Sequence, residues 1–230
     1  MSISIIIPTF NEEENIAQLI GYLKEHGENM LREIIVSDGN SNDLTVHLAA
    51  KAGAKVIKSP IRSRAAQMNL GANHASGNVL CFMHADVIPP KTYVRDILDA
   101  TANGYDFGCF RHKFNSKKSV LVLTSALWRK MNINVFGGDQ VFFILRIAFE
   151  SLNGFNEKYV IMEDFELADR ARKMFRRTII QKEVLASDRK YDHNNYLKVN
   201  IYNIIAYMMY RFGIQPIRIK RFYQMIYNYK

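Results

Sequence analysis

The chain has 230 residues, of which 48% are apolar, so it can bury a full core as one domain or as one domain with an appendage. Its net charge of +9 favours an anionic partner such as a nucleotide, a nucleic acid or an anionic lipid surface. No run of about 18 consecutive apolar residues occurs, which argues against a membrane-spanning helix, and the strand-like start predicts no secretory leader. Cys81 and Cys109 lack metal-type spacing and are expected to be reduced core thiols of a cytosolic protein.

Short apolar stretches alternate with helical patterns along the first 86 residues. Such alternation predicts parallel strands joined by right-handed helical crossovers. The first, second and fourth strands each end in polar residues, which in a parallel sheet meet at one edge and make a nucleotide-sized site there plausible. The strands are expected at residues 2–8, 32–37, 54–57 and 79–86, and the helices at 11–26 with Asn11 as N-cap, from Asp43 onward, and at 62–75.

The fourth strand leads into the most suggestive pair of side chains. His84 and Asp86 are two residues apart, so a strand would point both side chains the same way. An imidazole beside a carboxylate can hold a divalent ion, and that ion can hold a diphosphate. The alternative is that His84 and Asp86 simply cap the strand and the following helix.

In the second half of the chain, strands and helices are expected to alternate less regularly. A helix is expected at 89–102, a strand at 106–110, a helix at 117–131 and a turn at 137–140 before the apolar run 141–145. Glu163 and Asp164 open an amphipathic helix. Their carboxylates either stabilise the positive helix end or stand at the mouth of a site.

The C-terminal region has a different composition. Residues 189–230 contain eight Lys or Arg and one acid, interleaved with Tyr, Met, Ile and Phe. This pattern fits an amphipathic helix lying on an anionic membrane surface, and equally a helix packed on the core. The basic residues match no recognisable nucleic-acid reading motif, so no nucleic-acid partner is expected.

Taken in order, six motifs together resemble the family 2 glycosyltransferases. The motifs are Pro8-Thr9-Phe10-Asn11-Glu12; Ser37-Asp38-Gly39 with Ser41 and Asp43; Arg64 with Asn69 and Gly71; His84-Ala85-Asp86; Gly138-Asp139-Gln140; and Met162-Glu163-Asp164. The resemblance covers nearly the whole chain and looks most like a bacterial subgroup of small members. It implies the α/β GT-A fold, with a Rossmann-like, mostly parallel central sheet flanked by helices. The glycosyltransferase domain is then expected at 1–188, followed by a C-terminal amphipathic helical extension at 189–230.

The resemblance also implies roles for individual residues. Asp86 matches the last acid of the family's metal-binding acid-x-acid motif, and His84 replaces its first acid; a nitrogen ligand would favour Mn2+ over Mg2+. Asp164 matches the general base, and Asp139 would lie on the acceptor side. The residues implied in binding the nucleoside-diphosphate sugar are Pro8, Phe10, Glu12 and Asp38 at the base and ribose, and Arg64 and Arg189 at the diphosphate.

These roles imply an inverting, metal-dependent sugar transfer to an acceptor hydroxyl or phosphate. The location is expected to be cytoplasmic, peripheral at the inner membrane face, with a lipid-linked acceptor suggested by the C-terminal region. Two alternatives stay open: a non-catalytic nucleotide- or membrane-binding protein on a degenerate GT-A fold, and a sugar-nucleotide pyrophosphorylase. The second would need a Gly-rich basic loop after the first strand, where this chain has an acidic one.

Overall fold

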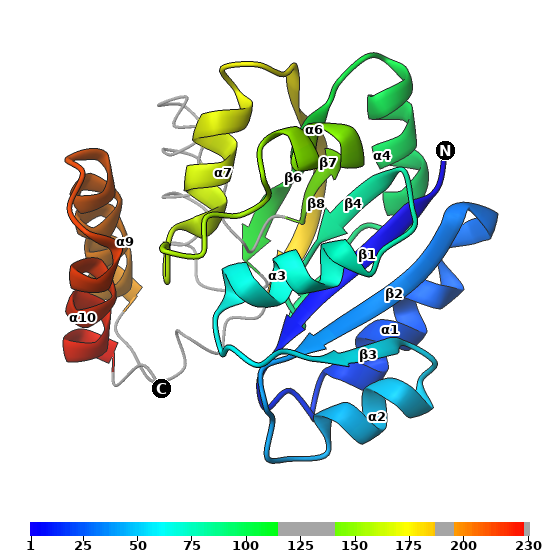
Figure 1. Ribbon diagram of the computed structural model, residues 1–230, viewed down its shortest axis with the longest axis horizontal. Coiled ribbons are helices and arrows are strands. Elements are labelled where there is room, and N and C mark those ends of the chain that lie inside the picture. Colours follow the sequence, from blue (N-terminus) through cyan, green and yellow to red (C-terminus); the bar gives the residue numbers. More distant parts are fainter. Residues whose placement is uncertain (115–140, 187–195, 228–230) are drawn as a thin grey trace.

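One curled sheet organises the molecule (Figure 1). The computed structural model describes residues 1–114, 141–186 and 196–227. Within them, the strands are hydrogen-bonded in the order β3-β2-β1-β4-β7-β6-β8-β5. The strands are β1 (Ile3–Thr9), β2 (Leu31–Asp38), β3 (Lys55–Lys58), β4 (Val79–Phe82), β5 (Val87–Ile88), β6 (Phe107–Phe114), β7 (Phe142–Leu145) and β8 (Arg177–Ala186).

Helices cover both faces of the sheet. One apolar cluster joins α1, α2 and α4 to one face, and a second joins α3, α6 and α7 to the other. A pair of helices, α9 and α10, follows outside these layers and lies beside α7 (Figure 1). The helices are α1 (Ile16–Glu25), α2 (Thr45–Lys51), α3 (Arg64–Asn73), α4 (Tyr93–Ala102), α6 (Arg146–Ser151), α7 (Glu163–Ala171), α9 (Tyr196–Arg211) and α10 (Pro216–Tyr227).

The apolar runs of the sequence explain why the central strands lie between two helical layers. In β1, Ile3, Ile5 and Ile7 enter one cluster, and Ile6 enters the other. Successive residues of a strand point to opposite faces, so a strand that is apolar at every position must be covered on both sides. The neighbouring strands β3, β2, β1 and β4 are all parallel, as predicted. The other half of the sheet is mixed, because β7 runs antiparallel to both β4 and β6.

The expected start of the first helix is wrong. The helix begins at Ile16 with Asn15 at its N-cap, whereas Asn11 has a φ of 54° and lies in the preceding loop. The backbone amide of Asn11 donates to the hydroxyl of Ser41 in the loop after β2 at 2.9 Å, and that of Glu12 donates to the hydroxyl of Thr45, the first residue of α2, at 2.7 Å. Such long-range hydrogen bonds offer the backbone an alternative to the helix, and the sequence pattern gives no sign of them.

Two further elements are not predicted by the apolar pattern. Strand β8 carries charged residues between its apolar ones, and it is held by long-range pairing with β6 and β5. The short helix α6 follows directly on β7. The helix expected at 117–131 lies outside the described residues, as does the expected domain boundary at 188.

The two cysteines match their expectation of free core thiols. Cys81 and Cys109 are both buried and neither is joined in a disulfide, and burial raises the pKa of each thiol. In the part of the chain that the structure describes, no helix is long and apolar enough to cross a bilayer.

Candidate functional site

The ends of β1, β2 and β4 meet at one edge of the sheet, as the sequence predicts. Thr9, the last residue of β1, pairs with Asp38, the last residue of β2. On the other side of β1, the amide of Met83 donates to the carbonyl of Ile6 at 3.2 Å, so the end of β4 adjoins the same strand. The polar residues after these three strands therefore share one edge, which is where open α/β sheets bind ligands.

Asp38 is buried at this edge and connects several groups there by hydrogen bonds. It is 1% exposed, and its carboxylate accepts hydrogen bonds from the Thr9 hydroxyl at 3.3 Å and from the amide and hydroxyl of Ser41. The amide of Gly39 donates to the carbonyl of Thr9 at 2.9 Å. Buried carboxylates require such partners, so Asp38 fixes the loop after β2 against the end of β1.

Gln67 on α3 reinforces the same junction, and the sequence reasoning missed it. Its side chain is 3% exposed, and its amide nitrogen donates to the carbonyls of Thr9 at 2.8 Å and Ser37 at 2.7 Å. One glutamine therefore bridges the ends of two adjacent strands. The only sequence signal was a polar residue on the otherwise apolar inner side of a predicted helix.

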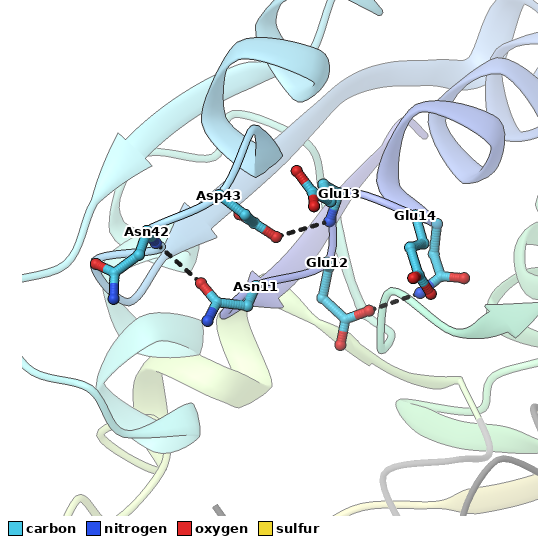
Figure 2. Close-up of a pocket in the computed structure, with 7 residues that line it drawn as sticks. Asn11, Glu12, Glu13, Glu14, Asn42 and Asp43 are labelled. Carbon is cyan, nitrogen blue, oxygen red and sulfur yellow. Dashed lines mark hydrogen bonds between the residues drawn. The ribbon is translucent and has the colours of Figure 1, made fainter.

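An acid-rich pocket lies beside this junction (Figure 2). Its volume is about 350 Å3. The two loops that form it are held together by bonds from the Glu13 amide to Asp43 at 3.2 Å and from the Asn42 amide to Asn11 at 2.9 Å (Figure 2). The residues that line it are Asn11, Glu12, Glu13, Glu14, Asn15, Asn42 and Asp43.

Hydrogen bonds hold Asp43 in its charged form within this pocket. Burial by itself would raise the pKa of Asp43, but the hydroxyl and amide of Thr45 and the amide of Glu13 outweigh it, and the pKa lies below its ordinary value. Asp43 thus caps the backbone just before α2 and tethers the loop before α1 at the same time.

Two arginines stand at the start of α3. The guanidinium carbon of Arg62 lies 3.2 Å from the centre of the Phe10 ring, so one face of this predicted base-binding ring is covered by a cation. Arg64 opens α3, and its Nη1 lies 3.9 Å from Oε1 of Glu163, which is 4% exposed. This pair joins the start of α3 to the start of α7.

His84 and Asp86 occupy a turn and not a strand, which corrects the geometric argument for their pairing. Strand β4 ends at Phe82, and the amide of Val87 donates to the carbonyl of His84 at 3.4 Å. Alternation along a strand therefore does not orient these two side chains. Both still lie directly after β4 at the polar edge and are half-buried.

His84 and Asp86 could coordinate a metal ion only together with atoms of a bound substrate. Within the described ranges, no group of three or more His, Cys, Asp or Glu side chains could hold a metal ion. His84 and Asp86 offer one nitrogen and one carboxylate, and oxygens of a bound diphosphate would have to complete the coordination. A mixed nitrogen and oxygen set of this kind suits Mn2+ better than Mg2+.

Asp164 lies in the first turn of α7, next to Glu163, where the helix dipole favours a negative charge. Its Oδ1 accepts a hydrogen bond from the amide of Phe165 at 2.8 Å. The contact between Arg64 and Glu163 brings this helix start toward the polar edge of the sheet. Asp139 and Arg189 lie outside the described residues, so their predicted roles stay predictions.

Asn69, another residue of the predicted motifs, holds two parts of the fold together. Its side chain donates to the carbonyl of Phe155 and to Glu157, both at 2.9 Å, and accepts from the amide of Phe155 at 2.9 Å. It therefore ties α3 to the turn before α7 and does not line the acid-rich pocket. Pro8, also predicted at the site, is buried and pairs with Ser37.

Comparisons with known proteins bear on the family and on the fold. The family model described as Glycosyl transferase family 2 matches residues 4–182. Dolichol-phosphate mannosyltransferase of Pyrococcus furiosus is 32% identical over 111 residues, which are 46% of this chain and 32% of that protein. The matched part thus spans about a third of that relative's length.

Solved structures share the fold. Glucosyl-3-phosphoglycerate synthase of Mycobacterium tuberculosis, in complex with Mn2+, UDP and glucosyl-3-phosphoglycerate, aligns with a TM-score of 0.61 at 20% identity over 93% of this chain and 80% of its own. Mannosyltransferase PcManGT of Pyrobaculum calidifontis, in complex with GDP-Man and Mn2+, aligns with a TM-score of 0.64 at 17% identity over 80% of this chain and 56% of its own. At these identities the likeness establishes the fold alone.

Proposed function

This chain belongs to glycosyl transferase family 2, and on that premise we propose that it transfers a sugar from a nucleoside-diphosphate sugar to a hydroxyl or phosphate oxygen of an acceptor. The observation that carries the proposal is the junction of β1, β2 and β4, where Asp38 and Gln67 fix the polar edge. Membership of the small bacterial subgroup with His84 in the metal motif is part of the same proposal.

The charges around the polar edge determine how the nucleoside-diphosphate sugar would be oriented when it binds. Four carboxylates line the pocket of Figure 2, and they would repel a diphosphate but can accept hydrogen bonds from ribose hydroxyls and base N–H groups. Arg62 and Arg64 stand at the start of α3, where a guanidinium and a helix N-terminus both favour phosphate. The base and ribose therefore belong near Glu12 and Asp43, and the diphosphate near Arg64.

A divalent ion, when bound, would be held by Asp86 and His84 and would neutralise charge on the departing diphosphate. The positive charge of Arg64 would further stabilise the departing diphosphate. Its partner Glu163 limits how Arg64 can move, because the carboxylate is buried and lies 3.9 Å away. Arg189 is proposed as a further diphosphate contact.

Asp164 is proposed as the general base. The acceptor hydroxyl gives its proton to the Asp164 carboxylate while its oxygen bonds to the anomeric carbon. The bond from that carbon to the diphosphate oxygen breaks, and the nucleoside diphosphate leaves with the electron pair. A single displacement from the opposite face inverts the anomeric configuration. Asp139 is proposed to contact the acceptor.

We further propose that the acceptor is lipid-linked and that transfer takes place at the cytoplasmic face of a membrane. One relative is named for a dolichol-phosphate acceptor. A structural neighbour is named for a phosphoglycerate product, so a phosphate-bearing acceptor is not confined to lipids in this fold. The C-terminal helices favour the lipid over the soluble acceptor, because their charge is positive and part of their apolar surface is exposed.

The test separates donor binding from turnover. Asp164→Asn should bind nucleoside diphosphate with Mn2+ as the unchanged protein does, yet lose turnover by about a hundredfold or more. Asp99→Asn, an exposed acid on α4, is the matched control and should retain full activity. Nuclear magnetic resonance of the product should show the opposite anomeric configuration to that of the donor. Normal turnover by Asp164→Asn would remove Asp164 from the role of base, and donor binding without any turnover in the unchanged protein would favour the non-catalytic alternative.

A further inference from the structure

The helices α9 and α10 form a pair with one covered side. Ala206 and Ile219 are fully buried and cluster with Met162, which directly precedes α7. The rings of Phe165 and Tyr210 lie 6.0 Å apart, and the Tyr210 hydroxyl donates to Asp169 at 2.9 Å. These contacts define an inner face of the pair, directed at α7.

The opposite side of α9 carries a continuous apolar stripe. Ile201, Ile204, Met208 and Phe212 follow one another at steps of three, four and four residues, which places them on one face of a helix. All four are exposed, and Phe212 is 77% exposed. The buried Ala206 lies two residues before Met208, so the helix turns it to the other side.

Helix α10 also has an exposed side, and it carries both basic and apolar residues. Ile217, Arg218, Arg221 and Met225 are all exposed and recur on one side of α10, with Met225 79% exposed. The buried Ile219 marks the other side. We define the outer face as the exposed sides of the two helices taken together, and its eight residues are Ile201, Ile204, Met208, Phe212, Ile217, Arg218, Arg221 and Met225.

The charge of this segment has one sign. Residues 196–230 contain no Asp or Glu, whereas they contain six Lys or Arg. A second copy of the chain on the outer face would bring the arginines of both copies together, which like charges oppose. A nucleic acid would meet the arginines but would leave the apolar stripe exposed to water.

We propose that the outer face of α9 and α10 docks on an anionic lipid bilayer. Exposed Ile, Met and Phe side chains would enter the boundary between headgroups and acyl chains, and Arg218 and Arg221 would meet anionic headgroups. The helices would then lie in the plane of the membrane, with α7 on the side away from the lipid. This proposal does not depend on the reaction proposed above.

Vesicle binding by the full chain tests the proposal. The protein is expected to co-sediment with vesicles of phosphatidylcholine and phosphatidylglycerol, and much less with phosphatidylcholine alone. Replacing both outer-face arginines by glutamine, in Arg218→Gln/Arg221→Gln, should weaken binding roughly 25-fold, from about fivefold for each basic residue. Lys51→Gln/Lys173→Gln removes the same charge from exposed lysines on α2 and after α7, and should retain most of the binding.

The apolar stripe is tested separately from the charge. Phe212→Glu should lower binding at least about tenfold, because it removes an inserted ring and adds a negative charge. Ile147→Glu is the matched control: Ile147 is 75% exposed on α6, away from the outer face, so binding should change little. Circular dichroism and the mass in solution are recorded for each variant.

Three outcomes would overturn the proposal. The full chain could ignore anionic vesicles, or Phe212→Glu could bind them as well as Ile147→Glu does. Alternatively, the protein could form a dimer that Phe212→Glu converts to a monomer without any change in vesicle binding, in which case a second copy occupies the face.

Discussion

Replacing Gln67 by leucine tests whether the polar edge is held together as described. The substitution keeps the approximate size of the side chain and removes two hydrogen bonds, to the carbonyls of Thr9 and Ser37. A net hydrogen bond is worth about 1 kcal/mol, and a buried carbonyl left without a partner costs about 1–3 kcal/mol. Thr9 keeps one donor, the amide of Gly39, so its cost should be at the lower end. The free energy of unfolding should therefore fall by about 2–4 kcal/mol.

Urea unfolding measures this loss, and two variants control for it. Gln181→Leu changes an exposed glutamine whose side chain donates to the carbonyl of Ile179 in its own strand, so stability should change by less than about 0.5 kcal/mol. Leu23→Ala, on the buried side of α1, should lower the free energy of unfolding by about 2–5 kcal/mol without changing the polar edge of the sheet.

The variants should also differ in nucleotide binding. Under conditions where all are folded, Gln67→Leu should bind nucleoside diphosphate more weakly than the unchanged protein, because the ends of β1 and β2 lose their common anchor. Leu23→Ala should bind it normally. A loss of stability below about 0.5 kcal/mol in Gln67→Leu, or equal nucleotide affinity in the two variants, would refute the role assigned to Gln67.

Two other predictions concern single contacts. Asp43 has a lowered pKa in the folded chain, so it stabilises the fold above its unfolded pKa of about 4, and this contribution disappears as the pH falls through the folded value. The stability difference between the unchanged protein and Asp43→Asn should thus be constant from about pH 5 to 7 and shrink below about pH 4; a difference that is the same at pH 3 and pH 7 would contradict this. Gly71→Ala would place a methyl group 2.4 Å from Ile6 and should cost about 1–3 kcal/mol in thermal or urea unfolding, whereas Gly21→Ala, with open space on α1, should gain about 0.5–1 kcal/mol. Equal effects of the two alanines would show that the packing of α3 on β1 is not as tight as described.

The parallel half of the sheet could be predicted because its strands contain short apolar runs that alternate with helical patterns. An apolar run such as residues 5–8 must be covered on both faces of the sheet, and the polar residues that follow it then fall on one edge. The junction of Thr9 with Asp38 follows from this topology. Local pattern and global fold agree in this part of the chain.

The parts that could not be predicted depend on long-range contacts. The loop before α1 is held by Ser41 and Thr45, about thirty residues away, and not by a local cap at Asn11. Strand β8 is charged at several positions and pairs with strands distant in the sequence. The polar residue Gln67 on the apolar side of a predicted helix is likewise not enough to predict the bridge, because its role depends on the two distant carbonyls to which it donates.

The central claim is that a nucleoside-diphosphate sugar binds where β1, β2 and β4 end, with a divalent ion near Asp86. Calorimetric titration of UDP and of GDP, each with and without Mn2+, tests it most directly. We expect one nucleotide to bind with Mn2+, and Asp86→Ala to abolish the metal-dependent part while Asp99→Asn leaves it unchanged. Failure of both nucleotides to bind in the presence of Mn2+, or an unchanged metal-dependent affinity in Asp86→Ala, would contradict the claim.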